Sequence, residues 1–158
     1  MTDMHEGATP KRPKLHPIRM QKTPAHLNGA AELEKLCFSS PWSATSLELL
    51  TNEGIGVGYL LTVPAAPGSE PAVAAYGGML ITVDEGQITN IAVHPDHRRK
   101  GYMKLAMNQA IADMVKDGIV LSTLGGRRQR YQYFGYDKAG PAYHFSISRD
   151  NIRHTYGD

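Results

Sequence analysis

The hydrophobic and polar positions of the chain switch between two periods, which predicts a fold of mixed helices and strands. Ala25–Cys37 and Lys100–Lys116 repeat apolar residues every three or four positions, as amphipathic helices do. Shorter apolar runs between glycine and proline turn signals predict strands. The predicted strands are Ile18–Met20, Gly56–Val63, Ala72–Val83, Gln87–Val93, Ile119–Leu124, Gly135–Ala139 and Ala142–Ser148.

The connections between these elements indicate how the sheet is built. Ser43 is a suitable N-cap for a second helix that runs through Leu50. The loop Pro64–Pro71 and the turn Asp84–Gly86 join successive strands directly, so we expect antiparallel neighbours. A helix leads instead into Ile119–Leu124, which predicts a buried strand reached by a crossover. We therefore predict an α/β (α+β) fold, a mixed and mostly antiparallel sheet with helices on both faces.

Composition fits one soluble globular domain. The chain has 158 residues, of which 41% are hydrophobic and 20% charged, so it can bury a real core. We expect a disordered tail over residues 1–16 and a single domain over residues 17–158. No apolar run reaches membrane-spanning length, and the start lacks the apolar centre of a signal peptide. Cys37 is the only cysteine, which suits a reducing compartment, so we expect a cytoplasmic protein without a membrane partner.

Basic residues gather immediately before the predicted helix 100–116. Arg98, Arg99 and Lys100 precede Gly101, and a glycine lets a ligand approach the backbone closely. The unpaired N–H groups of a helix start and the helix dipole both favour an anion. The pattern predicts a bound phosphate or diphosphate, whereas its ordinary alternative is a solvated helix cap.

The stretch from Ile88 to Gly101, with the sequence ITNIAVHPDHRRKG, resembles motif A of the GNAT acetyltransferases. This resemblance implies an N-acetyltransferase that uses acetyl-CoA. In that family a bulged strand pairs with the pantetheine arm and the thioester, and the following loop holds the pyrophosphate. Carried over, the resemblance implies that Ile91, Ala92 and Val93 line the pantetheine and the thioester. It implies that Arg98 fills the first position of the family signature and that the pyrophosphate is held by Arg99, Lys100, Gly101, Tyr102, Met103 and Lys104.

Two branches of the superfamily share the likeness. Residues 17–101, with Phe38–Ser43 (FSSPWS), resemble the RimI-type ribosomal-protein alanine N-acetyltransferases. Residues 101–154 are more similar to the enhanced-intracellular-survival acetyltransferases. We interpret the chain as a possible chimera joined near Gly101, with a natural divergent member as the alternative. The first likeness implies an acceptor at a protein N-terminus, such as that of a ribosomal protein, and the second implies a small amine or an aminoglycoside.

The sequence offers one candidate for the catalytic acid and several for the base. The family places a tyrosine on the short helix predicted around Arg127–Tyr133, just before a Phe-Gly-Tyr closure, and Tyr131 occupies that place. A phenol with a pKa of about 10 can protonate a leaving thiolate. Both family glutamates are absent, since Gln87 stands at one position. Glu85 is the nearest carboxylate in sequence; an exposed turn residue is the alternative reading, and His94 and solvent are the other candidate bases.

Other functions fit poorly. His94 and His97 lack further metal ligands at suitable spacing, so we expect no metal. The net charge is only +2, and the arginines of Arg127–Arg130 lack a base-stacking aromatic array, so we expect no nucleic-acid partner. We expect direct attack of a primary amine on acetyl-CoA within a ternary complex, in a monomer or homodimer. A scaffold that binds CoA without turnover is the non-enzymatic alternative.

Overall fold

The computed structural model describes residues 15–126 and 128–139. The chain divides into two compact units, Met1–Gly125 and Gly126–Asp158, and the single domain expected over residues 17–158 stays a prediction. The strands of the first unit are β1 (Ile18–Arg19), β2 (Gly56–Val63), β3 (Ala72–Thr82), β4 (Glu85–Val93) and β5 (Leu121–Leu124). Its helices are α1 (Pro24–Cys37), α2 (Ala44–Leu47), α3 (Tyr102–Lys116) and the 3₁₀ turns η1 (Glu48–Thr51) and η2 (Pro95–His97).

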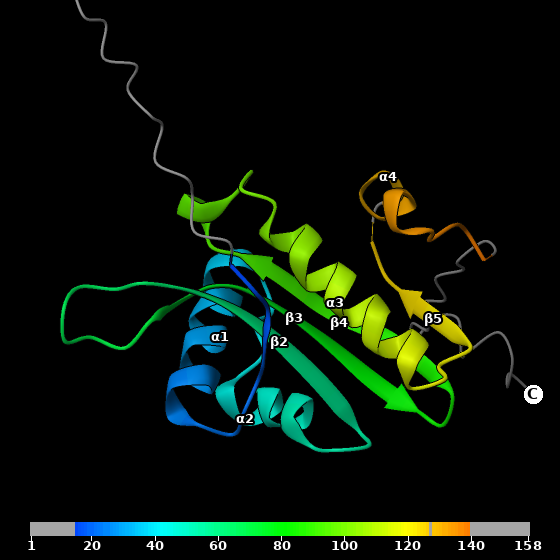
Figure 1. The fold of residues 1–158 in the computed structure, drawn as a ribbon, viewed down its shortest axis with the longest axis horizontal. Helices are drawn as coiled ribbons and strands as arrows, with labels where there is room; N and C mark the ends of the chain where they lie inside the picture. The colour runs from blue at the N-terminus through cyan, green and yellow to red at the C-terminus, as the bar shows by residue number, and fades with distance from the viewer. Residues whose placement is uncertain (1–14, 127, 140–158) are drawn as a thin grey trace, which may run out of the picture. The chain divides into compact units, whose positions relative to one another are not determined.

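The five strands form one sheet in the order β1-β2-β3-β4-β5. The first three pairings are antiparallel, and only β4 and β5 run parallel, after the crossover through α3 (Figure 1). This confirms the mixed, mostly antiparallel sheet predicted from the short loops. The parallel pair forms because a helix of 15 residues returns the chain to the same end of the sheet.

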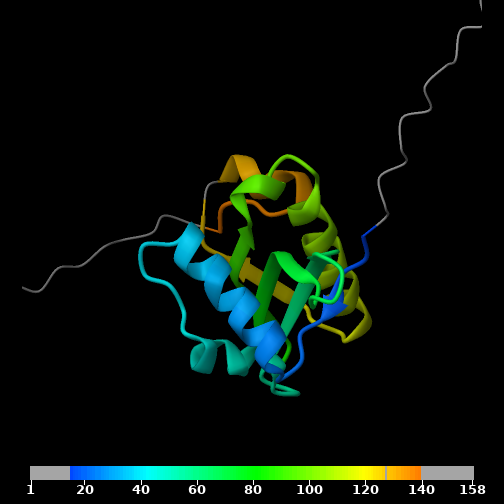
Figure 2. The ribbon, with the colours of Figure 1, turned by 90° about the vertical axis from the view of Figure 1, so that its left-hand side faces the viewer.

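Helices cover both faces of this sheet (Figures 1 and 2). Consecutive residues of a strand point to opposite faces of the sheet. Two neighbouring residues of β3 therefore show which helix covers each face. Tyr76 bonds to Glu34 of α1, whereas a Cβ added at Gly77 would lie 3.7 Å from Ala106 of α3. One core cluster therefore lies under α1 and α2 and another under α3.

Local sequence explains where α1 begins and which face it buries. The side chain of Thr23 accepts a hydrogen bond from the N–H of His26, and Pro24 stands at the first helical position, where its missing N–H costs nothing. The predicted apolar stripe is the buried face of the helix. It consists of Leu27, Ala30, Ala31, Leu33 and Glu34.

Several predicted boundaries differ from the structure. Ser43 caps α2 as expected, but the helix changes to 3₁₀ geometry at Glu48. The strand β4 begins at Glu85, so the expected turn over Asp84–Gly86 is shorter and falls at Val83 and Asp84. The helix α3 begins at Tyr102 rather than at Lys100, because the backbone of Gly101 has a positive φ.

The last part of the chain departs further from the predicted order. The strand expected over Ile119–Leu124 starts at Leu121, and its side chains are alternately exposed and half-buried rather than buried. In the second unit, α4 (Arg128–Tyr131) and η3 (Gln132–Phe134) form the expected short helix. The strand expected over Gly135–Ala139 is not formed, because Gly135 lies in a turn and residues 136–139 have no regular secondary structure. The strand expected over Ala142–Ser148 lies outside the described residues.

Val83 lies in a conformation that its side chain disfavours. It is 92% exposed in the two-residue turn between β3 and β4, with φ of 56°. A β-branched residue rarely adopts a positive φ, whereas asparagine does so readily.

We predict that Val83→Asn raises the free energy of unfolding by about 1 kcal/mol, because the strain of a positive φ is about 1–2 kcal/mol for most residues. Urea denaturation measures the change. Val115→Asn is the matched control, since Val115 is 75% exposed on α3 and the two residue types have similar helix propensity. Equal stabilities of the Val83 variant and the wild type would contradict the argument.

Candidate active site

The strand β4 carries an extra residue at its centre. Gly77 and Met79 of β3 are two residues apart, but their partners Ile91 and Ile88 are three apart. Thr89 and Asn90 therefore oppose Gly78 alone, which is the definition of a β-bulge. This confirms the bulge expected from the motif resemblance.

The bulge determines where the backbone groups of β4 point. His94 N donates to Ala74 O at 2.9 Å, so these two residues form a hydrogen-bonded antiparallel pair. Hydrogen-bonded pairs alternate with non-hydrogen-bonded pairs along an antiparallel ladder. Ala92 lies two residues before His94, so its backbone N–H and C=O groups also point toward β3. The N–H and C=O groups of Ile91 and Val93 accordingly point away from β3.

The pairing of the two parallel strands stops before it reaches these groups. β5 pairs with β4 only from Glu85 to Ile88, whereas β4 continues to Val93. Within the described part of the first unit, no strand pairs with Ile91 and Val93 on the side away from β3. An extended ligand can therefore lie along this edge and pair with the backbone as an added strand would.

The start of α3 lies close to the same end of β4. Tyr102 and Leu105 pack with Val93 in the core cluster that includes Ala106. The first helical bond runs from Leu105 N to Gly101 O at 3.1 Å. The amides of Tyr102 and Met103 hence have no acceptor inside the helix, and Gly101 provides no side-chain cap.

The loop before α3 is shaped to admit a ligand. Arg99 and Gly101 both have positive φ, 62° and 82°, and a Cβ built on Gly101 would meet nothing within 4 Å. Such left-handed turns let successive N–H groups converge on one anion. Arg98, Arg99 and Lys100 are exposed around it. The geometry favours a phosphate group at this helix start.

Two of the loop side chains have other partners. Arg98 Nε donates to Val93 O at 3.4 Å, and the Sγ of Cys37 also donates to that oxygen at 3.5 Å. Lys100 Nζ lies 3.0 Å from His97 Nδ1. Burial, followed by the nearby charge of Lys100, lowers the pKa of His97. A neutral His97 can accept a hydrogen bond from the Lys100 ammonium, which links these two side chains of the loop.

The two predicted catalytic residues belong to different units of the chain. Glu85 is exposed and is the first residue of β4. Glu85 lies six positions before Ile91, which is about 20 Å of strand before allowing for the bulge. Tyr131 ends α4 in the second unit, where its ring packs over Gly126: a Cβ there would come 2.7 Å from Cε2.

A buried carboxylate lies behind the bulge, and the sequence interpretation missed it. Glu34 is 0% exposed. Its Oε1 accepts from the hydroxyl of Tyr76 and from Asn90 Nδ2 at 2.8 Å, and its Oε2 accepts from Trp42 N at 2.8 Å. Burial and the bond to Glu34 raise the pKa of Tyr76, so the phenol remains a donor. The signal that the sequence offered for Glu34 was its place as an acidic residue on the apolar stripe of α1.

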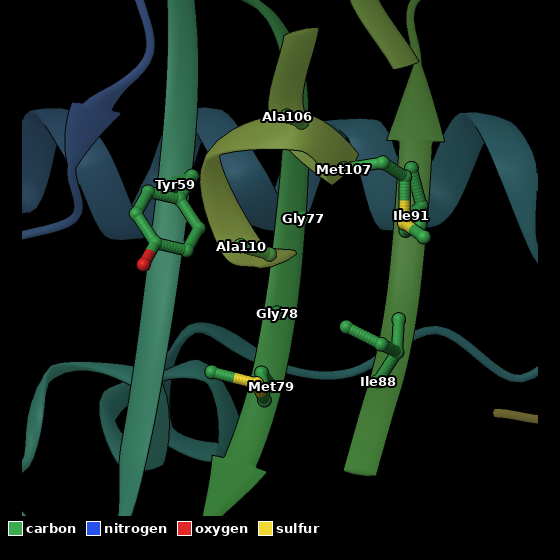
Figure 3. Close-up of a pocket in the computed structure, with 9 residues that line it drawn as sticks. All are labelled: Tyr59, Gly77, Gly78, Met79, Ile88, Ile91, Ala106, Met107 and Ala110. Carbon is green, nitrogen blue, oxygen red and sulfur yellow. The ribbon is translucent and has the colours of Figure 1, made fainter. Parts of the chain in front are cut away.

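The space between α3 and the sheet is too small for a substrate. Figure 3 shows the residues around it, which are apolar except for Tyr59. The cavity volume is about 10 Å³, which is at the limit of what one water needs. It is lined by Tyr59, Gly77, Gly78, Met79, Ile88, Ile91, Ala106, Met107 and Ala110. The cavity is a packing gap in the core, so the edge of β4 is the candidate ligand-binding surface.

Part of this chain is similar in sequence to a known protein domain. Residues 75–139 match the model of the acetyltransferase (GNAT) domain. No curated protein sequence matches the chain. No helix within residues 15–126 and 128–139 has the length and apolar character to cross a membrane.

Solved acetyltransferases have the same fold. A ribosomal-protein alanine N-acetyltransferase from Escherichia coli superposes with a TM-score of 0.66 at 22% identity, over 85% of this chain and 86% of that one. An aminoglycoside N-acetyltransferase in complex with CoA gives 0.63 at 14% identity, over 90% and 99%. An aminoglycoside acetyltransferase from an uncultured soil metagenomic sample, in complex with sisomicin, gives 0.62 at 12%, over 85% and 97%.

These matches show the fold of the chain, and the roles of the site residues stay predictions. The likeness of residues 17–101 and 101–154 to different branches, and a join near Gly101, stay predictions. The match to the GNAT acetyltransferase domain covers residues 75–139, and the likeness to the solved N-acetyltransferases shows that this chain shares their fold.

Proposed function

We propose that this protein transfers an acetyl group from acetyl-CoA to a primary amine, and that the amine is the N-terminus of a protein that begins with alanine. The observation that carries the proposal is the outward-facing backbone of Ile91 and Val93 beside the start of α3. An extended arm can pair with the strand while its phosphate end meets the helix start.

The residues present fit coenzyme A. Ile91 and Val93 offer backbone groups to the pantetheine arm, and Ala92 lies between them with its own backbone directed to β3. The pyrophosphate would be held by residues 99–104, through amides and nearby cations. Bound acetyl-CoA supplies an acetyl group that is activated as a thioester.

The chain's own groups then have to orient the acetyl group, admit a neutral amine and provide a proton. In this proposal an N–H on the outward edge of β4 holds the thioester carbonyl, where negative charge develops during attack. The amine attacks directly within a ternary complex. Phe38–Ser43, the loop between α1 and α2, borders the acceptor side of the sheet and so bears on acceptor choice.

Tyr131 is the proposed acid for the leaving thiolate. The short helix that carries it and the closure Phe134-Gly135-Tyr136 resemble the family pattern, and Gly135 ends η3 with a positive φ of 89°. The position of Glu85 at the start of β4 weighs against a direct role as base, so we assign deprotonation of the amine to solvent.

A small amine or an aminoglycoside is the second candidate acceptor. Its support is the fold likeness to two aminoglycoside acetyltransferases, which have TM-scores close to that of the alanine acetyltransferase. A protein N-terminus is favoured because the alanine enzyme has the higher identity and because Phe38–Ser43 resembles that branch. We further propose a cytoplasmic monomer or homodimer.

Gly101→Ala should weaken CoA binding by at least about tenfold, or about 1.4 kcal/mol. The substitution strains a backbone at φ 82° and places a methyl group in the space above the helix start. Isothermal titration calorimetry measures the affinity. Gly118→Ala is the matched control, because Gly118 follows α3 with φ of 73° and equally open surroundings. Equal affinity in both variants would count against this site for the pyrophosphate.

The acceptor can be identified by the release of free CoA. We expect release with an alanine-starting peptide and little with neamine or spermidine. The control is the same peptide with an acetylated N-terminus, which lacks the nucleophilic amine. Release with neamine alone would select the second candidate, and CoA binding without release from any amine would favour an inactive scaffold.

Tyr131→Phe should lower kcat by about a hundredfold, the scale of one general acid, with an unchanged Kd for CoA. Tyr133→Phe is the control, since Tyr133 is 70% exposed and packs edge-on against Phe134. A normal kcat in the Tyr131 variant would rule out its role as the acid.

A further inference from the structure

The carboxylate of Glu34 joins three separate parts of the first unit. Its helix, α1, packs against the sheet, while its partners lie on β3, on β4 and in the loop before α2. Two carboxylate oxygens accept from three donors: a phenol, an amide side chain and a backbone N–H. None of the bonds is between neighbours in sequence, since Trp42 is the nearest, eight residues away.

Such a group is costly to bury and must therefore be fully bonded. A carboxylate without partners is strongly destabilising inside a protein, whereas three donors, which include an amide and a phenol that stays protonated, compensate it. An apolar residue at position 34 would extend the stripe of α1 without this cost. The carboxylate thus provides specific geometry beyond the packing of the helix.

Two of its partners flank the site. Asn90 belongs to the bulge and immediately precedes Ile91, whose backbone faces the cofactor edge. Trp42 lies in the loop Phe38–Ser43 and packs, half-buried, against the core cluster that includes Tyr76 and Ala92. Glu34 spans the distance between these two partners through a single carboxylate.

We propose that Glu34 is a positioning residue that holds the acceptor-side loop at a fixed distance from the part of β4 that binds the thioester. This inference rests on the proposed function for the identities of the two sides. Glu34 touches neither reactant. It fixes the separation of amine and acetyl group, and a displacement of about 1 Å can cost about a hundredfold in rate.

The length of the side chain should therefore matter more than its charge. Glu34→Asp keeps the carboxylate but is one methylene shorter, so it cannot reach β4 and Trp42 together. Glu34→Gln keeps the reach. Its oxygen can accept from Trp42 N while the hydroxyl of Tyr76 and the amide of Asn90 turn to accept from its NH₂ group.

Trp42 is the only tryptophan, so its fluorescence reports on the loop alone. We expect acrylamide quenching to rise about threefold in Glu34→Asp, with kcat/KM for the alanine-starting peptide at least about tenfold lower. The Kd for CoA should stay within about twofold of wild type. Glu34→Gln should restore quenching and kcat/KM to near wild-type values.

Tyr59→Phe is the matched control. Tyr59 is also a buried tyrosine that donates to a carboxylate, that of Asp113, but on the α3 face. We expect this variant to lose thermal stability without any change in quenching or kcat/KM. Wild-type quenching in Glu34→Asp would overturn the proposal, as would an equal loss of kcat/KM in Glu34→Asp and Tyr59→Phe. A wild type that binds no CoA would refute the proposed function, while quenching would still decide whether Glu34 holds the loop.

Discussion

The bulge in β4 is the constraint on which the rest of the first unit depends. Without it, Ile88 and Ile91 would lie on opposite faces of the sheet, because they are three residues apart. Both face α3 and line the same small cavity. The extra residue restores the apolar face under α3 and directs Asn90 to the opposite face, where it meets Glu34.

Gly78 makes room for this geometry. A Cβ at this position would come 2.5 Å from Leu50 and 2.9 Å from Thr89 Oγ1, so a larger residue would push against the bulge. The two faces are then fixed by similar bonds, Tyr76 to Glu34 and Tyr59 to Asp113. Burial raises the pKa of both phenols, so both remain donors at neutral pH. The helices on each face are thereby tied to the central strands.

Elements with strong local signals could be predicted from the sequence. The helical period located α1 to within one residue of its start at Pro24, and the short loops predicted the antiparallel order correctly. The strand boundary predicted at Gln87 was wrong because it depends on pairing with distant residues. The strand β4 begins earlier, at Glu85, because its first residues pair with both β3 and β5. The sequence reveals a motif at residues 88–101, but Glu34 reads as one polar residue on an apolar stripe. Its partners are 8, 42 and 56 residues away, and no local pattern reports such contacts.

The central claim is that coenzyme A binds along the outer edge of β4 with its phosphates at the start of α3. A crystal structure of the protein with CoA tests it most directly. The account predicts pantetheine hydrogen bonds to the backbone of Ile91 and Val93, and a pyrophosphate on the amides of Tyr102 and Met103. CoA bound elsewhere, with this edge and this helix start in contact only with solvent, would contradict it.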